Sequence, residues 1–274
     1  IDLVLGQDHL IQNNEFVLNT GTPTQGAIIR LRGGQGVRAL NNLVTAPVAG
    51  AGAYPAFFVE NRSASYNDAE IRGNRVNGAV ETFVGPTGVP FRGGRSFANS
   101  LITDNTATCN LGIHLGATTN STVVQNNQIT YGATGTIGGV AVGFEALSWA
   151  VGIYDAGGSN IEYLNNSVVA STGVAAVGGT ALWFLSSNAL IDGNILDARG
   201  PGGAFGHGIA AVDASAPSAG AGATNATITN NTIRGTGNPG AGIAMWAAAN
   251  TNFLVEKNSQ RKLVMSSFTV HLIR

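Results

Sequence analysis

The chain has 274 residues, of which 44% are hydrophobic and 11% are charged, and its formal net charge is −1. This length and hydrophobic content suit one folded domain with a sizeable core. So few charges exclude the basic surface expected of a nucleic-acid-binding protein or of a polybasic membrane anchor, and the single cysteine, Cys109, excludes an intrachain disulfide.

The apolar stretches are short. Stretches such as 174–185 are interrupted by Gly and Thr, and they do not reach the roughly 20 residues that a membrane helix needs. The sequence begins at Ile1 without a charged segment followed by an apolar one, which is the pattern of a targeting signal, and removal of such a signal is left open. We therefore expect no membrane insertion.

A short motif recurs along the chain, from LIQNNEF at 10–16 to LVEKNSQ at 254–260. Nine such segments align on one asparagine, and their mean spacing of about 30 residues is typical of the coils of a solenoid. The aligned residues are Asn14, Asn42, Asn74, Asn105, Asn127, Asn166, Asn194, Asn231 and Asn258. Asparagine tolerates the left-handed conformation of a tight bend, and its amide can bond the equivalent amide of the next coil. We predict that these residues form both the bend and a ladder.

A strand led by glycine precedes most of the bends, as in LGIHLG at 111–116 and VGIYDA at 151–156. Alternation along a strand places one residue inside and its neighbour outside. The predicted inward residues are Ile113, Ile153, Leu182, Ile209 and Ile243. The predicted outward row is Asp2, Arg30, Phe58, Arg92, His114, Tyr154, Trp183, Ala210 and Ala244.

These Gly-Ile strands and Asn-Asn bends resemble the parallel β-helix repeat family over residues 1–258. The resemblance implies an all-β fold, a right-handed single-stranded parallel β-helix of about nine to ten coils with three short strands per coil. It also implies a secreted or cell-surface protein in which the Gly-Ile sheet carries the binding cleft. We expect residues 1–258 to form this domain and 259–274 to form an atypical tail, either a last strand or a cap.

Two inserts, 132–150 and 200–224, are rich in Gly, Ala, Ser and Pro. Loops that lengthen on one side of a solenoid commonly wall a cleft, and tolerated surface insertion is the alternative. At the start, Ile1, Leu3 and Leu5 alternate like a cleft-side strand. Because an open end would expose unpaired backbone groups, we expect an oligomer or additional domains to cover the ends.

The outward row carries residue types that suit an acidic polysaccharide. Aromatic faces such as that of Trp183 stack on sugar rings, and guanidinium groups such as that of Arg30 bind carboxylates. If the row is catalytic, His114 or Tyr154 would act as base or acid while Arg92 neutralises a uronate carboxylate. This resembles the uronate lyases and epimerases that share the fold, although by residue type alone, since none of their motifs is matched.

Further substrate-binding candidates are His207, Asp155 and Asp213. Gly206-His207-Gly208 resembles a segment of polygalacturonases, whose other motifs are missing. Asp155 and Asp213 are carboxylates near cleft strands two coils apart, roughly 9.6 Å, which is the upper limit for an inverting pair. Glycoside hydrolysis is therefore less favoured than lyase or epimerase chemistry.

No group of His, Cys, Asp and Glu has the spacing of a metal site, so we expect no cofactor, while a calcium ion held by scattered carboxylates is left open. The first functional hypothesis is an extracellular β-helix that binds or processes an acidic polysaccharide. The alternative is a non-catalytic surface stalk or adhesin resembling an autotransporter passenger or a phage tail protein. The sequence does not decide whether the chain is an enzyme.

Overall fold

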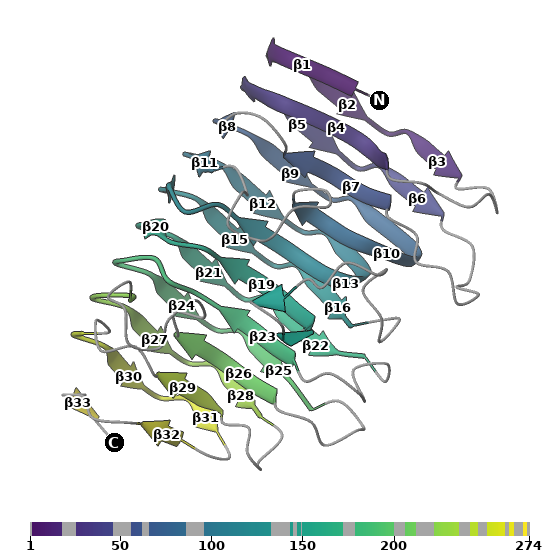
Figure 1. Cartoon of the computed structure of the whole chain (residues 1–274). Coiled ribbons are helices and arrows are strands. Elements are labelled where there is room, and N and C mark those ends of the chain that lie inside the picture. The colour runs from purple at the N-terminus through teal and green to yellow at the C-terminus, as the bar shows by residue number, and fades with distance from the viewer. Residues whose placement is uncertain are drawn as a thin grey trace.

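The computed structural model describes residues 2–17, 26–45, 56–61, 66–85, 96–132, 143–144, 147–148, 150–171, 179–199, 206–211, 222–235, 242–245, 251–260, 263–265 and 271–272. Within these ranges every regular element is a β-strand and no helix occurs. The strands stack coil upon coil from the N-terminal end to the C-terminal end as a parallel β-helix (Figure 1). The expected all-β solenoid is therefore confirmed.

Each coil contributes strands to three columns that run along the stack. The first column contains β1 (Asp2–Gln7), β4 (Gly26–Gln35), β7 (Ala56–Asn61), the C-terminal parts of β10 (Arg75–Gly85) and β13 (Thr106–Leu115), β19 (Ala150–Asp155), β23 (Gly179–Trp183), β26 (Gly206–Ala211), β29 (Ile243–Met245) and β32 (Leu263–Met265).

The second column is a separate ten-stranded sheet. Its members are β2 (Leu10–Gln12), β5 (Arg38–Leu40), β9 (Glu70–Arg72), β12 (Leu101–Thr103), β15 (Val123–Gln125), β21 (Glu162–Leu164), β24 (Leu190–Asp192), β27 (Thr227–Thr229), β30 (Leu254–Glu256) and β33 (His271–Leu272).

The third column contains β3 (Glu15–Val17), β6 (Leu43–Thr45), the N-terminal parts of β10 and β13, β16 (Gln128–Tyr131), β22 (Ser167–Ala170), β25 (Ile195–Asp197), β28 (Thr232–Arg234) and β31 (Ser259–Gln260). Two-residue strands lie at the turn between the first and second columns: β8 (Tyr66–Asn67), β11 (Phe97–Ala98), β14 (Thr119–Asn120) and β20 (Gly158–Ser159). A short antiparallel hairpin consists of β17 (Gly143–Phe144) and β18 (Leu147–Ser148).

The nine aligned asparagines are joined by side-chain hydrogen bonds from coil to coil. Asn105 Nδ2 donates to Asn127 Oδ1 at 2.9 Å, and Asn127 Nδ2 donates to Asn166 Oδ1 at 3.0 Å. Each inner amide also accepts a bond from a backbone N–H and donates one to a backbone carbonyl, as Asn127 does with Asn105 and Ile102. The bonds continue from Asn14 to Asn258, so the inner amides are buried with their hydrogen-bonding capacity used.

The bend differs in one respect from the expectation. The residue in the left-handed conformation is the one before each aligned asparagine, for example Asn126 with φ 54° and Asn165 with φ 54°. Gly73 and Gly193 take the same place with φ 65° and 69°. The aligned asparagine itself turns its side chain into the stack, so the tight bend and the ladder are tasks of two neighbouring residues.

The interior between the three columns is apolar. The predicted inward residues pair in register from Ile113 to Ile153, Leu182, Ile209 and Ile243, and all five are buried. This part of the core prediction is confirmed. The glycine that leads these strands lies where the third column meets the first, and a Cβ on Gly152 would overlap Val168 Cγ1 and the Ala181 carbonyl oxygen.

The end of the chain continues the stack where it is described. β31, β32 and β33 pair with β28, β29 and β30. Leu272 lies in β33, whereas Phe268 and Val270 lie outside the described residues. The described part of the chain holds no helix with the length and hydropathy that a membrane crossing requires.

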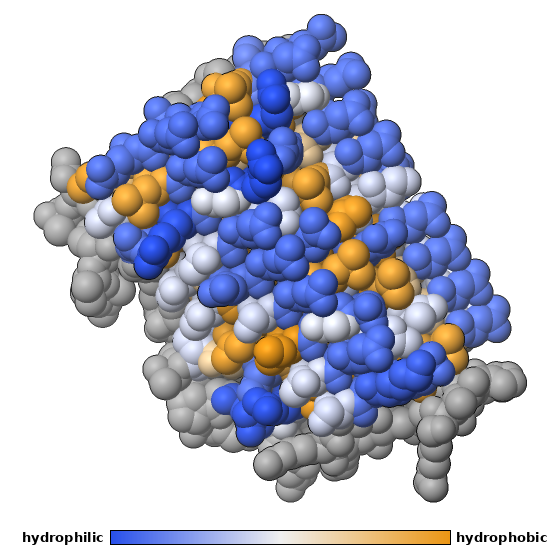
Figure 2. All heavy atoms as spheres, turned by 180° about the vertical axis from the view of Figure 1, so that it is seen from behind, coloured by the Kyte–Doolittle hydropathy of each residue, from blue (hydrophilic) through white to orange (hydrophobic). Residues whose placement is uncertain are grey.

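The face seen from behind is mostly hydrophilic, and its hydrophobic residues form separate patches among polar ones (Figure 2). Among the described residues, the large hydrophobic side chains that are exposed are Leu10, Val17 and Ile195. The apolar content of the sequence is therefore placed mainly in the interior.

Candidate functional site

The register of the first column fixes the outward row. Asp2 pairs with Arg30, Arg30 pairs with Glu60, and Glu60 pairs with Gly85. The structure thus places Glu60 and Gly85 where the sequence predicted Phe58 and Arg92, and these two positions were wrong. For Arg92 the reason is β10, which runs from the third column into the first without a long loop, so its coil reaches the first column before residue 92. For Phe58 the reason is the register of β7 on β4, which is two residues from the predicted one. Arg92 lies outside the described residues.

Further along the stack the predicted row is in register. His114 pairs with Tyr154, and Tyr154 pairs with Trp183. The His114 and Tyr154 ring centroids are 4.8 Å apart, and those of Tyr154 and Trp183 are 6.4 Å apart, both in edge-to-face geometry. We call these three residues the ring row. Such contacts stabilise aromatic neighbours in a folded protein.

The ring row is not open to solvent. His114 is 2%, Tyr154 5% and Trp183 3% exposed, and Ala210 and Ala244, which continue the row, are fully buried. A sugar ring stacks only on an aromatic face that it can reach, and a general base must lie within hydrogen-bonding distance of its substrate. In this arrangement the ring row is buried, and alternation along the sequence could not distinguish a buried row from an exposed one.

Asp155 lies in the interior. Its carboxylate accepts bonds from Tyr163 Oη at 2.9 Å, from the Gly157 backbone N–H at 2.8 Å and from the Ser186 backbone N–H at 3.3 Å. Burial raises the pKa of Asp155 to about 6, while the hydrogen bonds from Ser186, Gly157 and Tyr163 act in the opposite direction. With its carboxyl fully buried, Asp155 does not face a groove.

His207 is also fully buried, and it pairs with Thr180 of β23. Its neighbour Gly208 has a packing reason to be glycine, because a Cβ there would overlap Ile233 Cγ2. Gly208 of the Gly-His-Gly segment therefore has a structural explanation independent of any activity. Asp213 lies outside the described residues, so the structure does not place it relative to Asp155.

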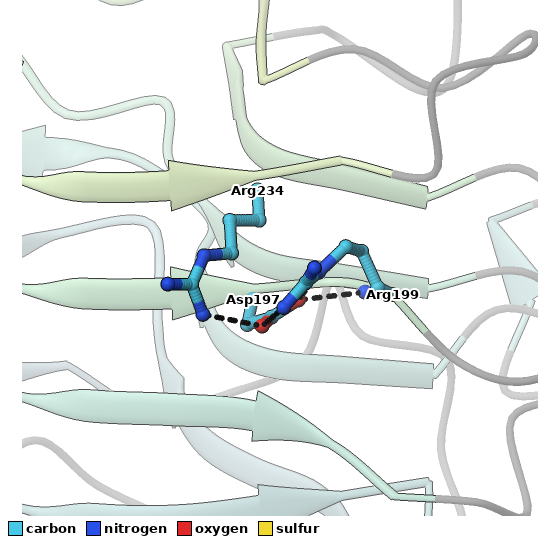
Figure 3. A network of polar contacts seen from close by, with 3 residues as sticks. All are labelled: Asp197, Arg199 and Arg234. Atoms are coloured by element: carbon cyan, nitrogen blue, oxygen red, sulfur yellow. Dashed lines mark hydrogen bonds and ion pairs between the residues drawn. The ribbon is translucent and has the colours of Figure 1, made fainter. Parts of the chain in front are cut away.

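A polar cluster that the sequence analysis missed lies at the ends of β25 and β28 (Figure 3). The Asp197 carboxylate accepts bonds from Arg199 Nε at 2.9 Å and Arg199 Nη2 at 2.7 Å, and Arg234 Nη1 lies 3.3 Å from Asp197 Oδ2. We call these residues the arginine cluster. A signal was present, since Asp197 and Arg234 each stand three residues after an aligned asparagine and pair directly in the register.

The electrostatics of the arginine cluster favour the ionised carboxylate. Burial acts to raise the pKa of Asp197, but the hydrogen bonds and charge of Arg199 and the hydrogen bond from Arg234 bring it below its usual value. The bond to Asp197 in turn raises the pKa of Arg199. Within the described ranges, no group of three or more His, Cys, Asp or Glu residues is arranged to hold a metal ion.

The column architecture and its ladder define the class, a parallel β-helix solenoid. The family model described as "Right handed beta helix region" matches residues 54–260, which is more than half of the chain. The chain therefore belongs to the right-handed β-helix family.

A search of curated proteins finds no match. Among solved structures, the chain is similar to tailspike protein 3 of bacteriophage CBA120, with a TM-score of 0.39 and 10% sequence identity. The alignment covers 99% of this chain and 50% of that chain, so this chain spans half the length of the tailspike.

Proposed function

We propose that this chain is a stalk or adhesin of a secreted or cell-surface protein, with a β-helix that serves as a rigid scaffold and does not catalyse a reaction. The observation that carries the proposal is the burial of the ring row. The residues with the types suited to uronate chemistry, His114 and Tyr154, are packed against each other and almost inaccessible. A catalytic base needs contact with its substrate, whereas a scaffold needs only a continuous, well-paired stack.

The scaffold role is supported by the coil-to-coil bonding. Eight successive hydrogen bonds between side-chain amides link the asparagines from Asn14 to Asn258. Repeat proteins derive their stability from such nearest-neighbour contacts and present long side surfaces. Binding to another surface would then use side chains on the outside of the columns.

The second candidate is an enzyme that acts on an acidic polysaccharide as a lyase or epimerase. The observation that favours it is the register of His114, Tyr154 and Trp183 on three neighbouring strands of the first column. A row of this kind has the right residue types for a uronate, with His114 or Tyr154 as acid or base and Arg30 further along the column.

Incubation with polygalacturonate and with mannuronate and guluronate polymers separates the candidates. A lyase releases unsaturated ends that absorb in the ultraviolet, and an epimerase changes the sugar composition without cleavage. We expect neither change after prolonged incubation. Either product, formed by the wild-type chain and lost in a folded His114→Gln variant, would contradict the scaffold proposal and favour the enzyme.

A further inference from the structure

The arginine cluster carries more positive charge than its own carboxylate balances. Two guanidinium groups approach one carboxylate, Asp197, from neighbouring coils (Figure 3). The local net charge is therefore +1 in a chain whose charged residues are few. The side chains of Arg199 and Arg234 are 40% and 43% exposed, whereas that of Asp197 is 10% exposed. The excess positive charge lies on the solvent side.

Hydrogen-bond donors remain available on both arginines. Arg199 uses Nε and Nη2 on Asp197, which leaves Nη1, and Arg234 uses Nη1, which leaves Nε and Nη2. None of these three nitrogens has a partner in the described part of the chain. Because Asp197 holds both guanidinium groups in place, little side-chain freedom remains to be lost when an anion binds them.

The surface beside the arginine cluster suits a sugar. Ile195, two residues before Asp197 on β25, is 44% exposed and offers an apolar surface. Ser167 and Thr232 pair with Ile195 on the strands on either side, and both are partly exposed. Apolar surface, hydroxyl groups and a cation together match the C–H face, the hydroxyls and the carboxylate of a uronic acid.

We infer that Arg199, Arg234 and Ile195 form a binding site for a carboxylated sugar on the outer face of the third column. This inference rests on the proposed adhesin function and gives that function a ligand class, an acidic oligosaccharide. It moves recognition away from the first column, where the ring row is buried. A purely structural ion pair is the competing explanation, and exposed pairs of that kind contribute little to stability.

Isothermal titration calorimetry with galacturonate oligomers tests the site. Replacing Arg234 by Gln removes the guanidinium that the next coil contributes to Asp197. Replacing Arg199 by Gln removes the bidentate partner of Asp197. Each change should raise Kd by about tenfold or more, since a charge-assisted hydrogen bond to the ligand is lost. Methyl-esterified oligomers of the same length should bind the wild-type chain no more tightly than the unesterified oligomers bind the two arginine variants. Higher salt should weaken the binding of the unesterified oligomers to the wild-type chain.

Arg38→Gln is the matched control, because Arg38 is an exposed arginine on β5 of the second column. Its Kd should equal that of the wild type, and thermal unfolding should show that all three variants are folded. Equal binding by all variants, an equal loss in the Arg38 variant, or equal binding of the methyl esters would overturn the inference. A preference for sulfated over carboxylated oligomers would overturn its ligand class.

Failure of the site and failure of the scaffold proposal give different results. Product formation by a chain whose binding still depends on Arg199 and Arg234 contradicts only the non-catalytic role. Absence of binding to any acidic oligomer contradicts the carboxylated-sugar site and leaves the stalk function standing.

Discussion

Asn126 and Asn127 are adjacent and chemically identical, yet they perform different tasks. Asn126 has φ 54° and is exposed, while Asn127 is buried and bonded to the coils on both sides. In the left-handed region glycine and asparagine are tolerated where most residues are strained. The buried position instead requires an amide, which has both a donor and an acceptor.

Asn127→Ala should destabilise the fold by on the order of 3 kcal/mol, because it removes the hydrogen bonds that this buried side chain makes with Asn105, Ile102 and Asn166. Asn126→Gly should change the free energy of unfolding by less than about 1 kcal/mol, since glycine accepts the same φ. Urea unfolding of the two variants measures the difference. Equal losses of unfolding free energy would contradict the prediction, because they would mean that the side-chain hydrogen bonds of Asn127 contribute no more stability than the bend residue Asn126.

Asp155 makes the stability of the fold depend on pH. Its pKa is raised to about 6 by burial, from an ordinary value of 3.8. In the folded state the carboxyl therefore keeps its proton at pH values where the unfolded chain has lost it. Stability contributed by the neutral group is fully present below about pH 4 and is lost as the pH rises toward 6.

Asp155→Asn should remove this dependence, because an amide can still accept the bond from Tyr163 without becoming charged. Relative to the wild type, the variant should become more stable by a few kcal/mol as the pH is raised from 4 to 8. Urea unfolding of both proteins at a series of pH values measures this difference. A constant difference between them would show that Asp155 does not titrate in this range.

At the scale of the element, alternation along each strand decides which residues fill the core. Ile153 and Ile195 are both isoleucines in short strands, but Ile153 is 1% exposed and Ile195 is 44% exposed. Ile153→Ala should cost about 2–5 kcal/mol, and Ile195→Ala should cost less than about 1 kcal/mol. Chemical denaturation provides both values, and a small loss at Ile153 would contradict the assignment of the interior.

The strands show how far the sequence could predict the structure. The aligned asparagines and the column from Ile113 to Ile243 could be predicted because each repeats the same local pattern in every coil. The register at Arg92 could not, because β10 continues from the third column into the first as one strand and pairs there at Thr82–Gly85. The register at Phe58 was two residues off, since Arg30 pairs with Glu60 of β7. Alternation also predicts on which face of the strand a side chain lies, but not whether solvent reaches that face. The burial of Trp183 was therefore not predictable.

Asp155 and the arginine cluster show the same limit for side-chain chemistry. Asp155 stands next to Tyr154 on β19, and only the fold reveals that Tyr163 from the second column bonds it inside the stack. Asp197 and Arg234 are 37 residues apart in the sequence. Aligning the coils on Asn194 and Asn231 places them side by side, since each follows its asparagine by three residues, but the alignment does not show that Arg199 from beyond β25 completes the cluster.

At the scale of the whole molecule, the stack is an assembly in which each coil pairs with its neighbours (Figure 1). Its interior is apolar, and the face seen in Figure 2 is mostly hydrophilic. Such an architecture supplies long side surfaces rather than one deep pocket. We propose that recognition uses the arginine cluster on the outer face of the third column and that the ring row contributes to packing. Both proposals concern where an acidic oligosaccharide binds, so one experiment can test them together.

That experiment is a crystal structure of the chain with a bound galacturonate oligomer. We expect a sugar carboxylate within hydrogen-bonding distance of the free nitrogens of Arg199 and Arg234, with a sugar ring over Ile195, and an unchanged, buried ring row. An oligomer stacked instead along His114, Tyr154 and Trp183, with Arg199 and Arg234 still bound only to Asp197, would contradict this proposal.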